Sequence, residues 1–251
     1  MGRIAVLSDI HGNIWALEAV LADAARQGCG ELLNLGDAFY GPLAPGATAR
    51  RLSALPNLRS IRGNQDRLLL EARLKSGPAG NPTLAYVLSE LGVAAWNWLE
   101  SLPGERLAAG EWLCCHGTPW DDAAYLIEDV STGRPVPRGA RTLLSMLGGA
   151  PGTHVLCGHS HLPRGTGAGG RLLVNPGSVG LPAYADDDPP HVMETGSPHA
   201  RYAIVERTDQ GYDVSLRCVA YDVQAAVSAA KERGREDWAV WLAEGFASGA
   251  G

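Results

Sequence analysis

Apolar runs that end in glycine and polar residues alternate with helical patterns along the first part of the chain. Residues 3–8 form a continuous apolar run that predicts a buried strand, and residues 13–25 place apolar side chains at helical spacing. Two further strands are predicted at residues 31–35 and 58–62, with a helical pattern at residues 48–55 between them. This alternation predicts a parallel sheet with covering helices, whose ligand-binding loops lie at the carboxyl ends of the strands.

The pattern changes in the second part of the chain. Residues 66–75 and 83–99 are helical in pattern, with a breaker rich in glycine and proline at residues 77–82. After Gly104, short strands separated by glycine and proline turns predict a second, mixed sheet packed on the first. These strands are expected at residues 105–107, 112–115, 155–157, 172–175, 201–207 and 213–219.

Three further segments complete the expected organisation. Residues 163–170 are rich in glycine and favour a hairpin over a phosphate-binding loop, because no helix follows them. The acidic segment 183–198 is expected to be a mobile loop, and residues 222–247 are expected to form an amphipathic helix or helix pair. We expect one domain over residues 1–251, with residues 222–251 as a C-terminal helical extension.

Composition narrows the class of protein. At 251 residues and 45% hydrophobic content, the chain can bury one large core. The net charge of -6 argues against nucleic acid as the main partner, because that binding relies on Lys and Arg, but it is compatible with a small phosphorylated ligand. Five cysteines without a Cys-x-x-Cys motif are typical of a reducing compartment, and no apolar stretch approaches the roughly 20 residues of a membrane span. We therefore expect a cytoplasmic protein without a membrane partner.

Five segments that each follow a predicted strand concentrate side chains of the metal-ligand type. Taken singly, Asp37 is typical of a helix or turn cap and Asn64 of a turn, but burying four unpaired imidazoles for packing alone would be unusual. Mixed carboxylate, amide and imidazole ligands suit divalent ions such as Mn²⁺, Fe²⁺ or Zn²⁺. The segments are Ser8-Asp9-Ile10-His11, Gly36-Asp37, Gly63-Asn64-Gln65-Asp66, His116-Gly117 and Gly158-His159-Ser160-His161.

With these motifs the chain resembles the calcineurin-like metallophosphoesterase superfamily, and within it the bacterial branch of small phosphodiesterases and diadenosine-tetraphosphatase-like proteins. The resemblance covers roughly residues 3 to 220 and also rests on Gly12-Asn13, Tyr40-Gly41-Pro42, Thr118-Pro119 and the stretch from Asn175 to Gly180. It implies an α/β fold in which two mixed β-sheets pack as a sandwich and are flanked by helices, in four layers.

The resemblance also implies the roles of the strand-end residues. In such sites a hydroxide that bridges two metal ions attacks the phosphorus in line, so no protein nucleophile is required. Asp37 would bridge the ions, and Asp37, Asn64 and His116 would be both ligands and catalytic residues. The resemblance puts Asp9, His11 and His161 on one ion, and Asn64, His116 and His159 on the other.

Gln65 departs from the family pattern, because many members have His at this position. An amide cannot act as a general acid near neutral pH. The departure therefore favours a leaving group that separates readily as an anion, such as a phosphate within a polyphosphate chain or an aryl oxide. We expect Gln65 to hydrogen-bond a phosphoryl oxygen and Asp66 to orient a ligand.

Three residues within or beside the motifs are candidates for substrate binding. Asn13 either contacts the substrate phosphate or orders the turn before the first helix. Tyr40 and Arg67 are near enough to the motifs to touch a phosphate or a base, although an exposed arginine is usually only solvated.

Together these motifs and the resemblance predict a metal-dependent phosphoesterase. We expect it to hydrolyse phosphodiester or phosphoanhydride bonds in small substrates, with nucleotides as candidates. Two alternatives stay open, namely a serine/threonine protein phosphatase and a non-catalytic metal-binding scaffold on the same fold.

Overall fold

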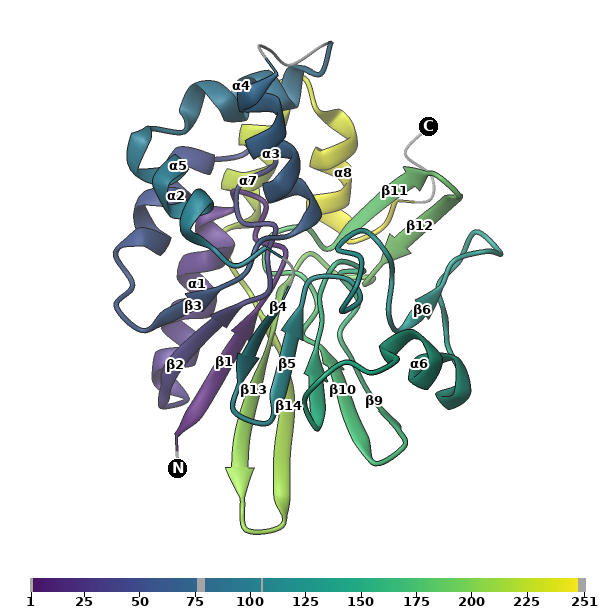
Figure 1. Ribbon diagram of the computed structural model, residues 1–251. Coiled ribbons are helices and arrows are strands. Elements are labelled where there is room, and N and C mark those ends of the chain that lie inside the picture. Colours follow the sequence, from purple (N-terminus) through teal and green to yellow (C-terminus); the bar gives the residue numbers. More distant parts are fainter. Residues whose placement is uncertain (1, 76–79, 105, 248–251) are drawn as a thin grey trace.

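The computed structural model describes residues 2–75, 80–104 and 106–247, and its main strands form two five-stranded sheets (Figure 1). In the order β14-β13-β1-β2-β3, the first sheet contains β1 (Arg3–Leu7), β2 (Cys29–Asn34), β3 (Leu58–Ser60), β13 (Ala200–Thr208) and β14 (Gly211–Val219). In the order β4-β5-β8-β10-β9, the second contains β4 (Arg106–Ala109), β5 (Trp112–Cys115), β8 (His154–Leu156), β9 (Arg164–Ala168) and β10 (Arg171–Asn175).

The two sheets pack face to face. Val6 and Leu33 of the first sheet meet Trp112, Leu156 and Val174 of the second in one buried cluster. The hydrophobic strand pattern explains this contact, because both faces of a central strand in such a sandwich are buried.

Helices cover the outer faces of both sheets. Leu17 and Val20 of α1 are fully buried in the cluster beneath the helices of the first sheet, and Leu143 and Leu147 of α6 are buried on the second. The order of layers is therefore helices, sheet, sheet, helix, and the predicted four-layer α/β sandwich is confirmed. The helices on the first sheet are α1 (Ile14–Arg26), α2 (Pro45–Ser53), α3 (Asn64–Leu74), α4 (Pro82–Glu90) and α5 (Val93–Ser101), and α6 spans Ala140–Leu147.

Parallel pairing brings the loops after the strands together. The strands β1, β2 and β3 run parallel to one another, as do β5, β8 and β10.

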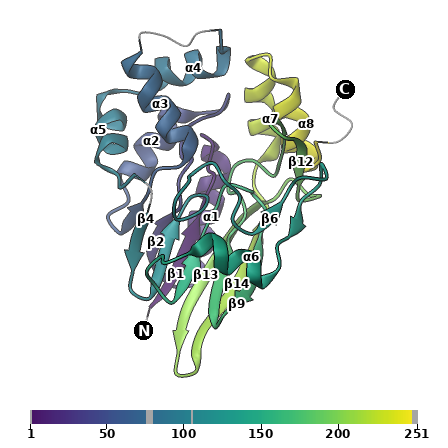
Figure 2. The ribbon, with the colours of Figure 1, turned by 45° about the vertical axis from the view of Figure 1, so that its right-hand side comes forward.

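Helices α7 (Val223–Glu232) and α8 (Glu236–Glu244) lie at the same end of the molecule as α3 and α4 in both views (Figure 2). The expected helix pair at residues 222–247 is thereby confirmed.

Two expectations about the later strands are wrong. The strands expected at residues 201–207 and 213–219 do not join the second sheet, because β13 pairs antiparallel with the free edge of β1 and β14 pairs with β13. The segment 183–198 is not a loop throughout: β11 (Ala183–Asp187) and β12 (Pro190–Glu194) form an antiparallel hairpin. The alternate residues His191 and Met193 of β12 are buried, and Met193 packs with Val130 and Leu162, which ties this hairpin to the body of the protein.

Smaller differences concern helix breaks and short elements. The helical pattern at residues 83–99 divides into α4 and α5, with Leu91 and Gly92 between them. Helix α6 and the short pair β6 (Glu128–Asp129) and β7 (Val136–Pro137) were not predicted. The hairpin expected at residues 163–170 is present as β9 and β10 with a glycine turn. Residues 77–79 of the expected breaker, Glu105 of an expected strand and the last four residues of the expected C-terminal extension lie outside the described residues.

Across the described ranges, no helix is long and apolar enough to cross a membrane.

Candidate metal centre

The loops after the strands hold all the non-glycine residues with a positive φ angle in the described part of the chain. Asp9, His11, Asp37, His159 and His161 have φ angles between 51° and 67°. This conformation costs an L-residue roughly 1–2 kcal/mol, so it persists only where the surrounding structure enforces it. Among the described residues, this kind of backbone strain is thus concentrated at five predicted metal ligands.

Glycines allow these loops to approach one another. A Cβ atom on Gly63 would lie 2.1 Å from Oδ1 of Asp37, and one on Gly158 would lie 2.0 Å from Oγ of Ser8. A Cβ atom on Gly180 would lie 1.8 Å from the carbonyl oxygen of Ile10. Real Cβ atoms essentially never make contacts under 3.0 Å, so the glycines of these motifs are required by packing around the site.

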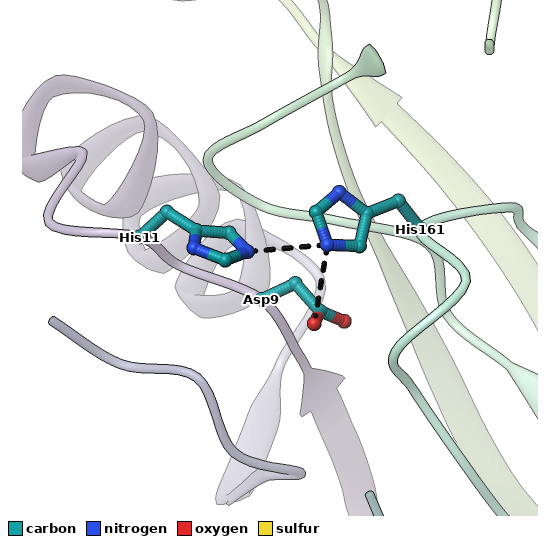
Figure 3. Close-up of side chains that lie close together, drawn as sticks. All are labelled: Asp9, His11 and His161. Atoms are coloured by element: carbon teal, nitrogen blue, oxygen red, sulfur yellow. Dashed lines mark hydrogen bonds and ion pairs between the residues drawn. The ribbon is translucent and has the colours of Figure 1, made fainter. Parts of the chain in front are cut away.

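The first group of candidate ligands is Asp9, His11 and His161 (Figure 3). Nε2 of His11 lies 3.1 Å from Nε2 of His161, which lies 3.3 Å from Oδ1 of Asp9. Nδ1 of His11 donates to the carbonyl oxygen of Tyr40 at 2.9 Å, and Nδ1 of His161 to that of Leu181 at 2.7 Å. In these tautomers both Nε2 lone pairs point toward a shared space, which a cation would stabilise.

The second group is Asp37, His116 and His159. Nδ1 of His116 donates to the carbonyl oxygen of Leu35 at 2.8 Å, and its Nε2 lies 3.4 Å from Oδ2 of Asp37. Nε2 of His159 donates to the carbonyl oxygen of Ala123 at 2.9 Å, which leaves Nδ1 of this ring for a ligand role. Within each of the two groups, one ligand atom from each residue lies within 4.8 Å of the others.

The two groups adjoin each other. Nε2 of His116 lies 3.8 Å from Oδ1 of Asp9, a member of the first group. Oδ1 of Asn64 lies 3.0 Å from Nε2 of His116, so an amide oxygen is added to the second group. The fold therefore brings together all seven predicted metal ligands.

Burial and neighbouring charges set the protonation of these side chains. Burial alone would raise the pKa of Asp9, but the imidazoles of His161, His116 and His11 hold it well below its usual range. Burial and His161 lower the pKa of His11 to about 4, and burial and His116 lower the pKa of His159 to about 4. Burial alone would lower the pKa of His116, but Asp37 and Asp9 raise it to about 10. Asp9, His11 and His159 are thus held in the forms that ligate metals, whereas His116 must lose a proton.

A buried oxygen atom of Asp9 without a hydrogen-bond partner and the mixture of ligand atom types both fit a divalent cation. Oδ1 of Asp9 is buried and has no hydrogen-bond partner. A buried carboxylate oxygen without a partner is costly unless an ion coordinates it. Imidazole nitrogens combined with carboxylate and amide oxygens suit Mn²⁺, Fe²⁺ or Zn²⁺.

Gln65 and Tyr40 line a cavity of about 200 Å³ that also contacts both ligand groups. Oε1 of Gln65 is buried without a hydrogen-bond partner, while its backbone N–H donates to Oδ1 of Asp37 at 2.9 Å. The hydroxyl oxygen of Tyr40 accepts a hydrogen bond from Nδ2 of Asn81 at 3.0 Å. Both residues stand where a bound ligand would reach them.

Asp66 lies beneath the site and does not line this cavity. Its carboxylate accepts hydrogen bonds from the backbone N–H groups of Asp37 at 2.8 Å, Ala38 at 3.0 Å and Gly63 at 3.1 Å. Burial and the charge of Asp37 raise the pKa of Asp66 to about 7. These contacts give Asp66 a role in holding two ligand loops together, and the expected orientation of a ligand by this residue is not supported.

Asn13 and Arg67 also make structural contacts. Oδ1 of Asn13 accepts from the N–H of Ala16, and its Nδ2 donates to the carbonyl oxygen of Gly180 at 2.9 Å. Of the two alternatives for Asn13, these bonds favour the ordering of the turn. Arg67 pairs with Asp122 at 2.8 Å and lines a separate cavity, so its expected contact with substrate is not supported.

Aromatic residues that sequence reasoning missed pack against the candidate ligands. The ring of Tyr125 stacks on His159 at 4.6 Å between centroids, and Tyr184 meets His161 edge to face at 4.6 Å. Trp238 meets His11 edge to face at 5.9 Å. The spacing of residues 238 and 241 on one helix face was a signal in the sequence, whereas no motif marks the two tyrosines. The missed residues of the cavity lining are Tyr125, Leu181, Tyr184, Ala185, Asp186, Arg235, Trp238 and Trp241.

Comparison with known proteins gives relatives of matching length. MJ0912, an uncharacterized protein of Methanocaldococcus jannaschii, is 26% identical over 263 residues, which cover 94% of each chain. The solved structure of a metallophosphoesterase from Sphaerobacter thermophilus is 27% identical, with a TM-score of 0.77, and covers 98% of this chain and 99% of that chain. The hypothetical protein PH1004 from Pyrococcus horikoshii OT3 is 20% identical with a TM-score of 0.73 at the same coverage, which shows a shared fold.

A family comparison agrees with the strand-end motifs. The model of the calcineurin-like phosphoesterase superfamily domain matches residues 3–197, which include all the candidate ligands described above. The chain therefore belongs to the calcineurin-like phosphoesterase superfamily, a family of divalent-metal-dependent phosphoesterases.

Proposed function

We propose that this protein uses two divalent ions to hydrolyse phosphodiester or phosphoanhydride bonds in small substrates. The observation that carries the proposal is the pair of adjoining ligand groups, each with one carboxylate and two imidazoles. Two ions bound there would supply an acidified water as the nucleophile and would stabilise the charge of the phosphoryl group.

The residues of the site divide this work. Asp9, His11 and His161 would hold one ion, and Asn64, His116 and His159 would hold the other. Asp37 would be a ligand that the two ions share. The hydrogen bonds from the histidine rings to backbone carbonyl groups fix which ring nitrogen faces each ion, and such outer contacts also raise the basicity of the ligands.

Gln65 limits the choice of leaving group. Its side chain lines the cavity, where its Nε2 amide group would donate a hydrogen bond to a phosphoryl oxygen, while Oε1 can only accept one. An amide cannot protonate the departing oxygen. Substrates whose leaving group is a stable anion, such as a phosphate or an aryl oxide, are therefore favoured over alkyl monoesters, and nucleotides are candidate substrates.

The proposal includes the ions and the compartment. Mn²⁺, Fe²⁺ and Zn²⁺ are the ions that the donor set supports. The structure contains five free cysteines, which supports a reducing compartment and hence a cytoplasmic location.

The test is turnover of bis(p-nitrophenyl) phosphate beside p-nitrophenyl phosphate with added Mn²⁺. The wild type should hydrolyse the diester, the Asp37→Ala variant should not, and Asp213→Ala, which removes an exposed carboxylate of β14, should match the wild type. Absence of diester turnover in a wild-type protein that binds two ions would contradict the enzyme proposal and favour the scaffold.

A second variant tests the role of Gln65. Gln65→His restores a proton donor, so the ratio of alkyl to aryl ester turnover should rise. An unchanged ratio would count against the leaving-group argument.

A further inference from the structure

One face of the C-terminal helix α8 lines the candidate active-site cavity. Trp238 and Trp241 are three residues apart on this helix and share a face, and Arg235, the residue that caps its N-terminus, lines the same cavity. The edge-to-face contact of Trp238 with His11 places this face next to the first ligand group. All three residues lie beyond residues 3–197, the segment that the family model matches.

Arg235 is held in one orientation by two neighbours. Nε and Nη2 bind the carboxylate of Asp237 at 2.9 and 2.6 Å, and Nη1 donates to Oγ1 of Thr83 at 2.5 Å. A guanidinium has five N–H donors, so two of them have no acceptor among the described residues. Because Asp237 offsets the charge of Arg235, the group offers directed hydrogen bonds more than net positive charge.

Trp241 adds a second unused donor. Its side chain lines the same cavity, and its Nε1–H group is buried without a hydrogen-bond partner. Trp241 is only 9% exposed, so water does not compensate for the missing partner as it would at the surface. A buried donor of this kind calls for an acceptor on a ligand.

The cavity favours a phosphate over a nucleobase at this face. Trp238 and Trp241 are 4% and 9% exposed, so they offer no open ring surface for base stacking. The volume of about 200 Å³ lies below the 300–1,000 Å³ typical of sites that enclose a drug-sized ligand. Only the phosphoryl part of a larger substrate would be enclosed.

Asp186 is the carboxylate of the lining that is not among the candidate ligands. It lies on β11 and accepts a hydrogen bond from the backbone N–H of Asp188 at 3.1 Å. Its negative charge disfavours a phosphate on the hairpin side of the cavity. A second anionic group is therefore favoured on the side formed by α8, where Arg235 and Trp241 have N–H donors without an acceptor among the described residues.

We propose that Arg235 and Trp241 bind a second phosphoryl group, joined to the scissile phosphoryl group by an anhydride oxygen. This inference rests on the proposed function and narrows its substrate class to phosphoanhydrides. The two donors hold the phosphate that departs, which stabilises its charge where Gln65 supplies no proton.

The test compares inhibition by two stable analogues of bis(p-nitrophenyl) phosphate turnover in Mn²⁺. Methylenediphosphonate carries two phosphoryl groups and methylphosphonate carries one, so the ratio of their inhibition constants measures the second site. Loss of a charge-assisted hydrogen bond should reduce the preference for the diphosphonate by about 10- to 100-fold in Arg235→Gln. Trp241→Phe keeps the aromatic packing and should reduce it by about threefold to tenfold.

Arg233→Gln is the matched control. Arg233 is a neighbouring arginine that stacks on Tyr86 at 4.2 Å and does not line this cavity, so the ratio should stay at the wild-type value. An unchanged ratio in the folded Arg235 and Trp241 variants would overturn the inference. If Arg235→Gln does not fold, the Trp241→Phe result decides.

Failure of the proposed function is distinguishable from failure of this inference. If the wild type does not hydrolyse the diester, calorimetric titration of the same variants with methylenediphosphonate and methylphosphonate replaces the inhibition assay. If the wild type prefers the diphosphonate and both Arg235→Gln and Trp241→Phe reduce that preference, the second phosphate site is supported although the proposed hydrolysis is not. Equal preference in the wild type and in both variants would overturn the site.

Discussion

The strand-end loops and the outer wall of the cavity are built in different ways. In the loops, five of the seven candidate ligands have positive φ angles, and glycine contacts that leave no room for a Cβ atom lock the loops against one another. The wall consists of the hairpin β11–β12, Tyr125 and α8, and its parts are held together by hydrogen bonds between side chains. The hydroxyl of Tyr125 hydrogen-bonds the hydroxyl of Tyr184 at 2.8 Å and Nε2 of His191 at 2.9 Å. The difference teaches that the backbone fixes the candidate metal ligands, whereas hydrogen bonds between side chains hold the outer wall of the cavity.

The largest expected effect is the loss of a metal ligand in the loops. His116→Ala should reduce kcat/KM for bis(p-nitrophenyl) phosphate by about a thousandfold or more, because metal ions supply several kcal/mol of transition-state stabilisation. His199→Ala is the matched control, since His199 is in neither ligand group and its Nδ1 atom lies 3.1 Å from Oγ of Ser197. Equal turnover in the two variants, measured at saturating Mn²⁺, would remove His116 from the site.

Filling a glycine contact in the loops should cost stability. Gly63→Ala places a methyl group against Asp37, so we expect the free energy of unfolding to fall by about 3 kcal/mol or more. Gly30→Ala is the control: a Cβ atom there meets nothing within 4 Å, and the change should stay within about 0.5 kcal/mol. Urea denaturation measures both, and a Gly63→Ala protein as stable as the control would show that the loops are not locked.

Removing a hydroxyl from the wall should have a smaller effect. Tyr125→Phe leaves the hydroxyl of Tyr184 and a nitrogen of His191 with one partner fewer, which should lower the free energy of unfolding by about 1–2 kcal/mol. Thermal denaturation with and without Mn²⁺ measures the loss. A loss as large as that of Gly63→Ala would erase the contrast between loops and wall.

The smallest expected effect concerns pH and the wall residue Asp237. Burial alone would raise its pKa, but the hydrogen bonds from Arg235 lower it below the usual 3.8. Because the pKa is lower in the folded state, the pair stabilises the folded protein fully above the unfolded-state pKa of 3.8. This stability is lost as the pH falls through the folded-state pKa. Since the pair is partly exposed, Asp237→Asn should cost at most about 1 kcal/mol at pH 7.

The gap between wild type and Asp237→Asn should be smaller when unfolding is measured at pH 3 than at pH 7, because pH 3 lies below the usual pKa of 3.8. A gap of the same size at pH 3 and pH 7 would mean that the charge of Asp237 contributes nothing.

The ligand residues could be predicted from the sequence because each motif is local and follows a strand. An apolar run followed by Asp9 and His11, or by His159 and His161, carries both the position and the chemistry in a few adjacent residues. The meeting of these motifs then follows from the parallel pairing of strands, whose carboxyl ends share an edge of the sheet.

The wall could not be predicted in the same way. Asp186 and Tyr184 belong to a segment whose acidic residues and prolines resemble a loop, and burial of alternate residues of β12 shows only in the folded chain. The place of β13 beside β1 is a long-range pairing without a local sequence signal. Asp66 and Asn13 adjoin ligand motifs in the sequence, but they support the loops from beneath and do not line the cavity. One domain over the whole chain stays a prediction.

The central claim is that each ligand group holds one ion. Mass-spectrometric metal analysis after Mn²⁺ loading and removal of free ions should find two Mn²⁺ per wild-type chain. It should find about one in His161→Ala, which damages only the first group, and about one in His159→Ala, which damages only the second. A single ion in the wild type, or full occupancy in both variants, would contradict the two-ion site.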